Sequence, residues 1–184
     1  MSLLILLIEL SIDIICVGGK NMLLKFDKIY SSVDELPDDL SSPFTTAALL
    51  VHAICSYDPS NEEVCYKMIQ KLMGEAQEFN NFDRSFMKDQ MRDKWKYIGK
   101  SYFKGATPEN DYTPDEPLEI EVEENPYSYQ EEGYARLLLK SGGSDNDRFV
   151  TLRKMKDGRY VIWSDSYKGL LAGIRQPESI NPWA

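Results

Sequence analysis

The sequence predicts an α+β fold in which about three N-terminal helices pack on a C-terminal antiparallel sheet of about four strands. In residues 43–98, apolar side chains recur at three- and four-residue spacing, which is typical of amphipathic helices. In residues 133–163, three short apolar segments are separated by glycine-centred turns at residues 142–145 and 157–158. Asp-Gly between strand-forming residues is typical of a hairpin. A loop-rich helical half followed by a sheet half is therefore expected.

The composition fits one acidic domain. The chain has 184 residues, of which 42% are hydrophobic, enough for a single core, and we expect one domain over residues 22–184. The formal net charge of −9 opposes nucleic-acid binding, because affinity for phosphates depends on lysine and arginine. The three cysteines are odd in number and not closely paired, which argues against a disulfide framework or a zinc site. A reducing compartment suits them, and no cofactor or metal is expected.

Residues 1–21 form an apolar extension for which three interpretations compete. Residues 1–17 lack the basic start of a signal peptide, are interrupted by two acids and are short for a membrane span. The segment is a first element packed on the domain, a weak membrane anchor, or an upstream region translated from a wrongly chosen start. We favour the third interpretation, because codons for residues 18–21 can spell a purine-rich ribosome-binding site ahead of Met22.

Three helices are expected after residue 42. The first spans residues 43–57, with Ser42 as N-cap and Pro43 in the first turn, and its narrow polar stripe indicates a buried helix. The second follows Ser60, which has the capping-box spacing to Glu63, and ends at Gly74. The third begins near residue 81, and its apolar face comprises Phe82, Phe86, Met87, Met91, Trp95 and Ile98.

The strands of the sheet half differ in how firmly the sequence places them. Residues 118–123 alternate between apolar side chains and glutamates, which predicts a half-exposed strand. The register of the last hairpin stays open. With a two-residue loop, Leu152 opposes Trp163, and with a three-residue loop Leu152 opposes Ile162. Both registers bury Leu152.

The connecting segments are less regular. Residues 23–29 form a short strand or the start of a loop, and residues 167–174 a short helix. The long connection over residues 99–117 is expected to be pinned by Tyr102, Phe103 and Tyr112. Trp183 is expected to dock on the domain, because a free indole at a chain end would expose apolar surface.

Acidic residues concentrate between residues 107 and 132, a stretch without lysine or arginine. A solvated acidic face is the simpler interpretation. A docking surface for a basic protein partner is the alternative.

The sequence names no catalytic residue. His52, the only histidine, lies three residues before Cys55 on the same predicted helix, whereas a nucleophile and its base normally come from separate elements. A buried histidine, hydrogen-bonded in the core, is the better interpretation. Phosphate-binding glycine loops and zinc-protease motifs are absent. Residues 142–147 lack the ligand spacing of a calcium loop and are expected to form a hairpin turn.

The candidate binding surface consists of tyrosines and arginines in and around the predicted sheet. Aromatic and arginine side chains in loops are typical of recognition surfaces, whereas the alternative is that the tyrosines brace an irregular loop against the sheet. The candidate residues are Tyr112, Tyr127, Tyr129, Tyr134, Arg136 and Arg175.

Three motifs resemble the signatures of a family of uncharacterised proteins from anaerobic gut Gram-positive bacteria, classed as a domain of unknown function. They are SYFKGATPENDYTP (residues 101–114), ENPYSYQEEGYA (residues 124–135) and the closing NPWA (residues 181–184). The resemblance covers the chain from about Phe44 onward. It implies a bacterial cytoplasmic protein and brings no catalytic residues. More loosely, helices followed by a curved sheet that ends in KDGRYVIW are similar to the nuclear-transport-factor-2-like fold, an analogy that says little about function.

These observations favour a non-enzymatic binding or interaction module, whose partner is a protein or a small ligand. No membrane partner is expected unless residues 1–17 are genuine. The alternative is a small-molecule-binding or hydrolytic domain with a pocket between helices and sheet. A deep apolar pocket lined by His52, or a buried carboxylate, would favour that alternative.

Overall fold

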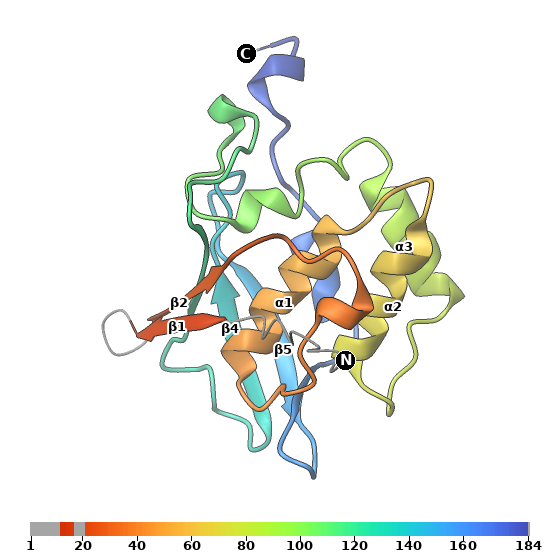
Figure 1. Cartoon of the computed structure of the whole chain (residues 1–184), viewed down its shortest axis with the longest axis vertical. Helices are drawn as coiled ribbons and strands as arrows, with labels where there is room; N and C mark the ends of the chain where they lie inside the picture. The colour runs from red at the N-terminus through yellow and green to blue at the C-terminus, as the bar shows by residue number, and fades with distance from the viewer. Residues whose placement is uncertain (1–11, 17–20, 184) are drawn as a thin grey trace, which may run out of the picture.

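The computed structural model describes residues 12–16 and 21–183, and it has the α+β fold that the sequence predicts. One curled antiparallel sheet contains six strands in chain order, and helix α1 crosses one face of it with α2 and α3 beside α1 (Figure 1). Two strands precede the helices and extend the sheet beyond the four expected. The strands are β1 (Asp13–Cys16), β2 (Asn21–Phe26), β3 (Leu118–Glu123), β4 (Tyr134–Leu139), β5 (Arg148–Lys154) and β6 (Tyr160–Ile162); the helices are α1 (Pro43–Cys55), α2 (Glu62–Met73) and α3 (Asn81–Met91).

Helix α1 is the buried central helix that the sequence predicts. The Ser42 hydroxyl accepts a hydrogen bond from the Thr45 N–H at 3.3 Å, and Pro43 occupies the first turn, where its missing N–H costs nothing. Every residue from Thr45 to Ile54 is buried. The helix contacts strands β2 to β6, so it holds the core of the whole sheet.

The start of α2 differs from the prediction. Ser60 does not cap the helix, because its N–H and hydroxyl both donate to the Asp58 carboxylate at 2.7 Å, which stabilises the preceding turn instead. Asn61 is the residue before the helix. The end is as predicted, since Gly74 takes a positive φ of 73° that favours glycine.

Helix α3 begins where expected but ends at Met91, before Trp95 and Ile98, and one residue of its predicted apolar face is exposed. Asn80 and Asp83 form a reciprocal capping box. Met87 and Met91 are fully buried, whereas Phe82 is 72% exposed. The reason is geometric: five residues separate Phe82 from Met87, and at 3.6 residues per turn they lie well over a quarter-turn apart.

The inner face of the sheet consists of side chains that pack against α1. Leu137, Leu152 and Ile162 are all fully buried, as the alternation predicts. Leu152 pairs with Ile162, which is the register of the three-residue loop. Gly158 ends that loop at φ 94°, a conformation typical of three-residue hairpin loops.

The long connection after α3 is pinned by buried aromatic side chains, as expected. Tyr102, Phe103 and Tyr112 are at most 2% exposed, and the Tyr102 hydroxyl donates to the Leu170 carbonyl at 2.7 Å. Gly143 permits this packing, because a Cβ there would lie 2.2 Å from the Tyr112 hydroxyl oxygen. The glycines between β4 and β5 therefore reverse the chain and also allow the long connection to pack closely against this turn.

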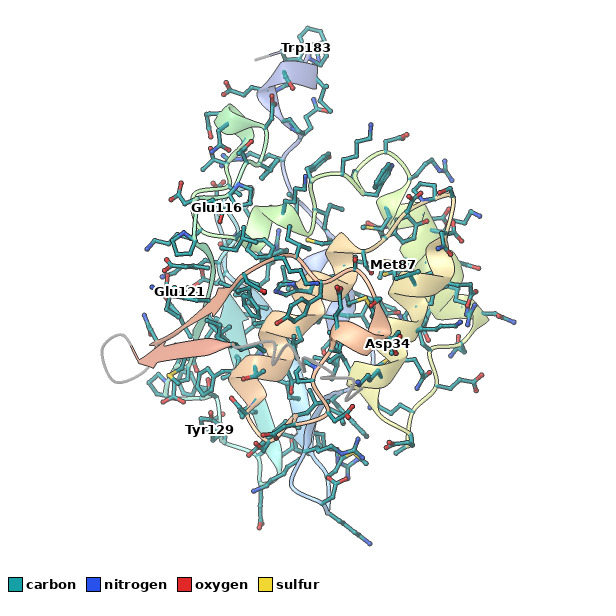
Figure 2. The ribbon with its side chains drawn as sticks, in the orientation of Figure 1. Asp34, Met87, Glu116, Glu121, Tyr129 and Trp183 are labelled. Atoms are coloured by element: carbon teal, nitrogen blue, oxygen red, sulfur yellow. The ribbon has the colours of Figure 1, made fainter. Side chains whose placement is uncertain are left out.

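The C-terminal segment departs from the prediction. Residues 166–170 form a short 3-10 helix, η4 (Ser166–Leu170), which overlaps only the first half of the helix expected over residues 167–174. Trp183 does not dock: it is 91% exposed, at the far end of the C-terminal segment (Figure 2). Its N–H donates to the Asn181 side chain at 3.0 Å, so the tail ends in a local turn.

Residues 1–11 and 17–20, where most of the start-site hypothesis falls, lie outside the described residues. Within the described part, β1 pairs with β2, with Ile14 opposite Leu24. The proposal that translation begins at Met22 therefore stays a prediction. Over residues 12–16 and 21–183, no helix is long and apolar enough to cross a membrane.

The inner and outer faces of β5 should respond differently to truncation. Leu152→Ala removes a fully buried side chain and should lower the free energy of unfolding by about 2 to 5 kcal/mol. Thr151→Ala, the neighbouring change on the outer face, should cost less than about 1 kcal/mol. Urea denaturation measures both, and equal losses would contradict this assignment of the two faces.

Candidate binding surface on the outer face of the sheet

The structure separates the six candidate residues into three pairs. Tyr112 and Arg175 lie at the base of the C-terminal segment, where the Tyr112 hydroxyl donates to the Arg175 carbonyl at 2.5 Å. Tyr127 and Tyr129 lie in the loop between β3 and β4. Tyr134 and Arg136 lie on β4 itself.

In the first pair, Tyr112 is structural, whereas Arg175 is exposed. Tyr112 is fully buried and stacks on Tyr97, with 5.4 Å between ring centroids and 11° between ring planes. Burial raises the pKa of Tyr112 to about 12. Arg175 pairs with Asp145 at 3.4 Å and donates to the Gly142 carbonyl. The bracing interpretation therefore describes Tyr112, which does not contribute to an exposed surface.

The second pair is exposed on a loop attached to β4. Tyr127 is 65% and Tyr129 48% exposed. The Arg136 N–H donates to the Ser128 carbonyl at 2.8 Å and fixes the loop alongside the strand. In Figure 2, Tyr129 lies far from Met87 of α3. These two tyrosines are available to a partner at the β4 side of the molecule.

The third pair belongs to a larger layer of rings and guanidinium groups, which we call the outer surface. The Arg136 Cζ lies 3.9 Å from the centre of the Phe149 ring. The Arg153 Cζ lies 4.3 Å from the Trp163 ring centre and 5.4 Å from that of Tyr134. Both contacts are within cation–π range. The outer surface comprises Tyr134, Arg136, Phe149, Arg153 and Trp163.

Strand alternation and register produce this arrangement. Because Ala135 and Leu137 face the core, Tyr134 and Arg136 must face outward. Antiparallel pairing places Tyr134 opposite Arg153, and Leu138 opposite Phe149. The sequence analysis missed Phe149, Arg153 and Trp163. The alternation in residues 148–154 indicates which side chains of that strand face outward. It does not show which side chains of neighbouring strands meet, because the register of the last hairpin was open.

Most acids of residues 107–132 are exposed, as the expected solvated face requires, but the glutamates of strand β3 are not. Glu119 is only 9% exposed and pairs with Lys25 and Lys104, each at 3.2 Å. Lys140 pairs with Glu123 and, at 3.8 Å, with Glu121. The reason is that lysines from other segments surround the glutamates, which weakens β3 as a dock for a basic partner.

The arginines of the outer surface are placed differently. Arg136 and Arg153 are exposed. Within residues 12–16 and 21–183, neither forms an ion pair with a carboxylate. A cleft of about 450 Å³ adjoins Arg153 and is lined in part by Arg153, Val161 and Trp163. The outer surface therefore combines one exposed ring, Phe149, two half-buried rings, available cations and a shallow hollow.

His52 and Cys55 form no catalytic pair. His52 is fully buried, its Nδ1 accepts a hydrogen bond from the Tyr30 N–H at 3.0 Å, and its ring centroid lies 4.3 Å from that of Phe26. Burial lowers its pKa to about 3, and burial raises the pKa of the Cys55 thiol to about 12. A neutral core histidine beside a protonated thiol supplies neither base nor nucleophile near neutral pH.

The described part of the chain also contains no candidate metal site. There, no group of three or more histidine, cysteine, aspartate or glutamate side chains is placed to hold a metal ion.

The fold and surface define an α+β domain with an exposed aromatic and arginine layer on its sheet. The chain belongs to the family described as Domain of unknown function (DUF6935), which matches residues 25–178. No curated protein and no solved structure matches the chain. The likeness to the nuclear-transport-factor-2-like fold stays an analogy of element order.

The single histidine provides a test of the core. Because its folded pKa is about 3 and its unfolded value about 6.5, the unfolded state binds more protons between those values, so stability must fall as pH falls through that window. Between pH 7 and about 5 the loss should reach about 2 kcal/mol. The carboxylates titrate mainly below this range.

Urea denaturation across that range measures the loss, and the variant His52→Gln should lack it. In the folded protein, the NMR signal of the one imidazole should not titrate above about pH 5. An imidazole that titrates near 6.5 in the native state would show that His52 is solvated.

Proposed function

We propose that this protein is a non-enzymatic interaction module that binds a protein partner on the outer surface. The observation that carries the proposal is the exposed layer in which Arg136 covers Phe149 and Arg153 covers Trp163. Interfaces are enriched in arginine and aromatic side chains, and these types dominate binding energy.

The position of this layer supports the proposal. Leu138 and Val161, the cross-strand partners of Phe149 and Arg153, are buried, although they lie outside the main core cluster that packs on α1. The rings are therefore held by a rigid sheet. Because these side chains are already ordered in the free protein, binding a partner costs little further conformational entropy. Tyr127 and Tyr129, on the loop beside β4, extend the same side.

Charge indicates the chemistry of the partner segment. Arg136 and Arg153 have no carboxylate partner within the described residues. A partner segment with acidic and aromatic side chains would form ion pairs with these arginines and pack on the rings beside them. The basic partner that the sequence offered as an alternative would have to bind acidic residues outside β3, because the glutamates of β3 already pair with lysines. The proposal also includes a bacterial cytoplasmic setting, supported by the free thiols of Cys55 and Cys65 and by the family-like motifs.

A small-molecule-binding domain is the second candidate. One observation favours it: the side chain of Asp83, a largely buried carboxylate, lines a cleft of about 360 Å³ between α3 and the segment after β6. The cleft has the buried carboxylate that was expected for that alternative, but its lining is mainly polar rather than apolar.

Charge reversal tests the interaction proposal. The immobilised variant Arg136→Glu with Arg153→Glu should capture its partner from a lysate of the native host about tenfold less than wild type, because two anchor contacts become repulsive. Quantitative mass spectrometry of the captured proteins measures this. Capture by wild type should also weaken as ionic strength rises from about 0.05 M to about 0.5 M.

The matched control is Lys67→Glu with Lys94→Glu, which makes the same change in net charge at two exposed lysines on the helical side. It should capture as wild type does. Tyr127→Ala with Tyr129→Ala should weaken capture without unfolding the protein. If the arginine variant and the control capture the same proteins equally well, the outer surface is not the binding site.

A further inference from the structure

Lys168 of the short helix η4 occupies an unusual position beside α3. Its ammonium nitrogen lies 5.1 Å from the ring centres of both Phe82 and Phe86 and 5.8 Å from that of Tyr167. The same nitrogen lies 3.4 Å from the Asp83 carboxylate and 3.5 Å from that of Asp165. Three rings and two carboxylates therefore surround one cation, and only 19% of the Lys168 side chain is exposed.

The inner parts of this enclosure, which we call the cage, are held independently of Lys168. Asp83 accepts hydrogen bonds from the Tyr167 hydroxyl at 2.7 Å and from the Asn80 N–H at 3.2 Å. Tyr167 is fully buried, and Phe86 packs against the core. The rings of Phe86 and Tyr167 and the inner carboxylate would therefore stay in place if the lysine moved out. The cage comprises Phe82, Asp83, Phe86, Asp165 and Tyr167.

Phe82 is the part of the cage that core packing does not explain. It is 72% exposed, so it gains little from burial at the start of α3. Its contact with the Lys168 ammonium is of the cation–π type, which remains favourable at exposed sites. The neighbouring cleft of about 360 Å³, lined by Phe82, Asp83, Asp165 and Lys168, opens the cage to solvent. A lysine on a flexible four-carbon stem can leave by this route.

We propose that the cage is a binding site for an organic ammonium ion and that Lys168 fills it as an internal occupant that the ligand displaces. Rings and carboxylates around a cation are the chemistry by which proteins recognise alkylated ammonium groups. A weakly hydrated organic cation suits such a site better than a metal ion, which prefers several oxygen ligands. The ligand is a free quaternary ammonium compound or the lysine side chain of a partner, and both present an organic ammonium head group.

Removal of the internal occupant is the test. Lys168→Ala should bind tetramethylammonium, followed by NMR titration of the ring protons of Phe82 and Phe86, at least about tenfold more tightly than wild type. The control Lys67→Ala removes the same charge from an exposed site on α2 and should bind as wild type does. Lys168→Ala with Phe82→Leu keeps the apolar bulk, removes the ring, and should lose the gain.

A parallel titration with N-acetyl-lysine amide separates the two sources of the head group. Tightening with tetramethylammonium alone assigns the site to free quaternary compounds, and tightening with the lysine derivative as well assigns it to a partner's lysine. Both results support the cage. Equal affinity of wild type and Lys168→Ala for both probes, or an unchanged gain in the Phe82→Leu background, would overturn it.

A measurement on wild type keeps the test valid if Lys168→Ala does not fold. The rings should shift the Lys168 side-chain methylene signals upfield, and saturating tetramethylammonium should return them toward their values in a free lysine. Signals that remain unmoved while the probe is in excess would show that Lys168 is a fixed structural ion pair, and the proposal would fail.

Discussion

The rest of the structure depends on the burial of one sheet face against helix α1. Alternate residues of five strands meet the helix, and the side chains of Leu24, Ile120, Leu137, Leu152 and Ile162 are fully excluded from water. Burial of a leucine-sized side chain contributes roughly 1.5 to 3 kcal/mol, so this contact determines the strand register as well as the stability. Since a shift by one residue would exchange the two faces, the same contact also fixes which side chains face outward. The exposed rings and arginines of β4 and β5 are therefore a consequence of the core.

Local rules were enough to predict the parts of the fold that local chemistry controls. Ser42 and Pro43 marked the start of α1, Gly74 the end of α2, and alternation placed Leu137 and Leu152 inside. Competition between neighbouring groups defeated the same rules elsewhere. Ser60 bonds to Asp58 rather than to the helix, and Phe82 lies off the buried face although its spacing to Phe86 fits. Trp183 lies in a local turn at the end of an extended tail, which no periodicity indicates.

The candidate sites were harder to predict, because their members come together only in three dimensions. Tyrosines near the sheet were the correct residue type, but Tyr112 serves as a brace inside the protein. The outer surface depends on cross-strand pairs, such as Tyr134 with Arg153, that an open register conceals. The cage joins Asp83 to Tyr167 across 84 residues of sequence. Both proposals place recognition on groups that a rigid core holds in position, with His52 kept neutral and out of any acid–base role near neutral pH.

The most direct test of the central claim is NMR of the free protein with a soluble paramagnetic agent, which broadens signals according to their exposure. The account predicts that the methyl signals of Leu137, Leu152 and Ile162 stay sharp while the ring signals of Phe149 broaden. Broadening of the three methyl groups, with the ring signals of Phe149 protected, would contradict it, because the face assigned to partners would then be the core.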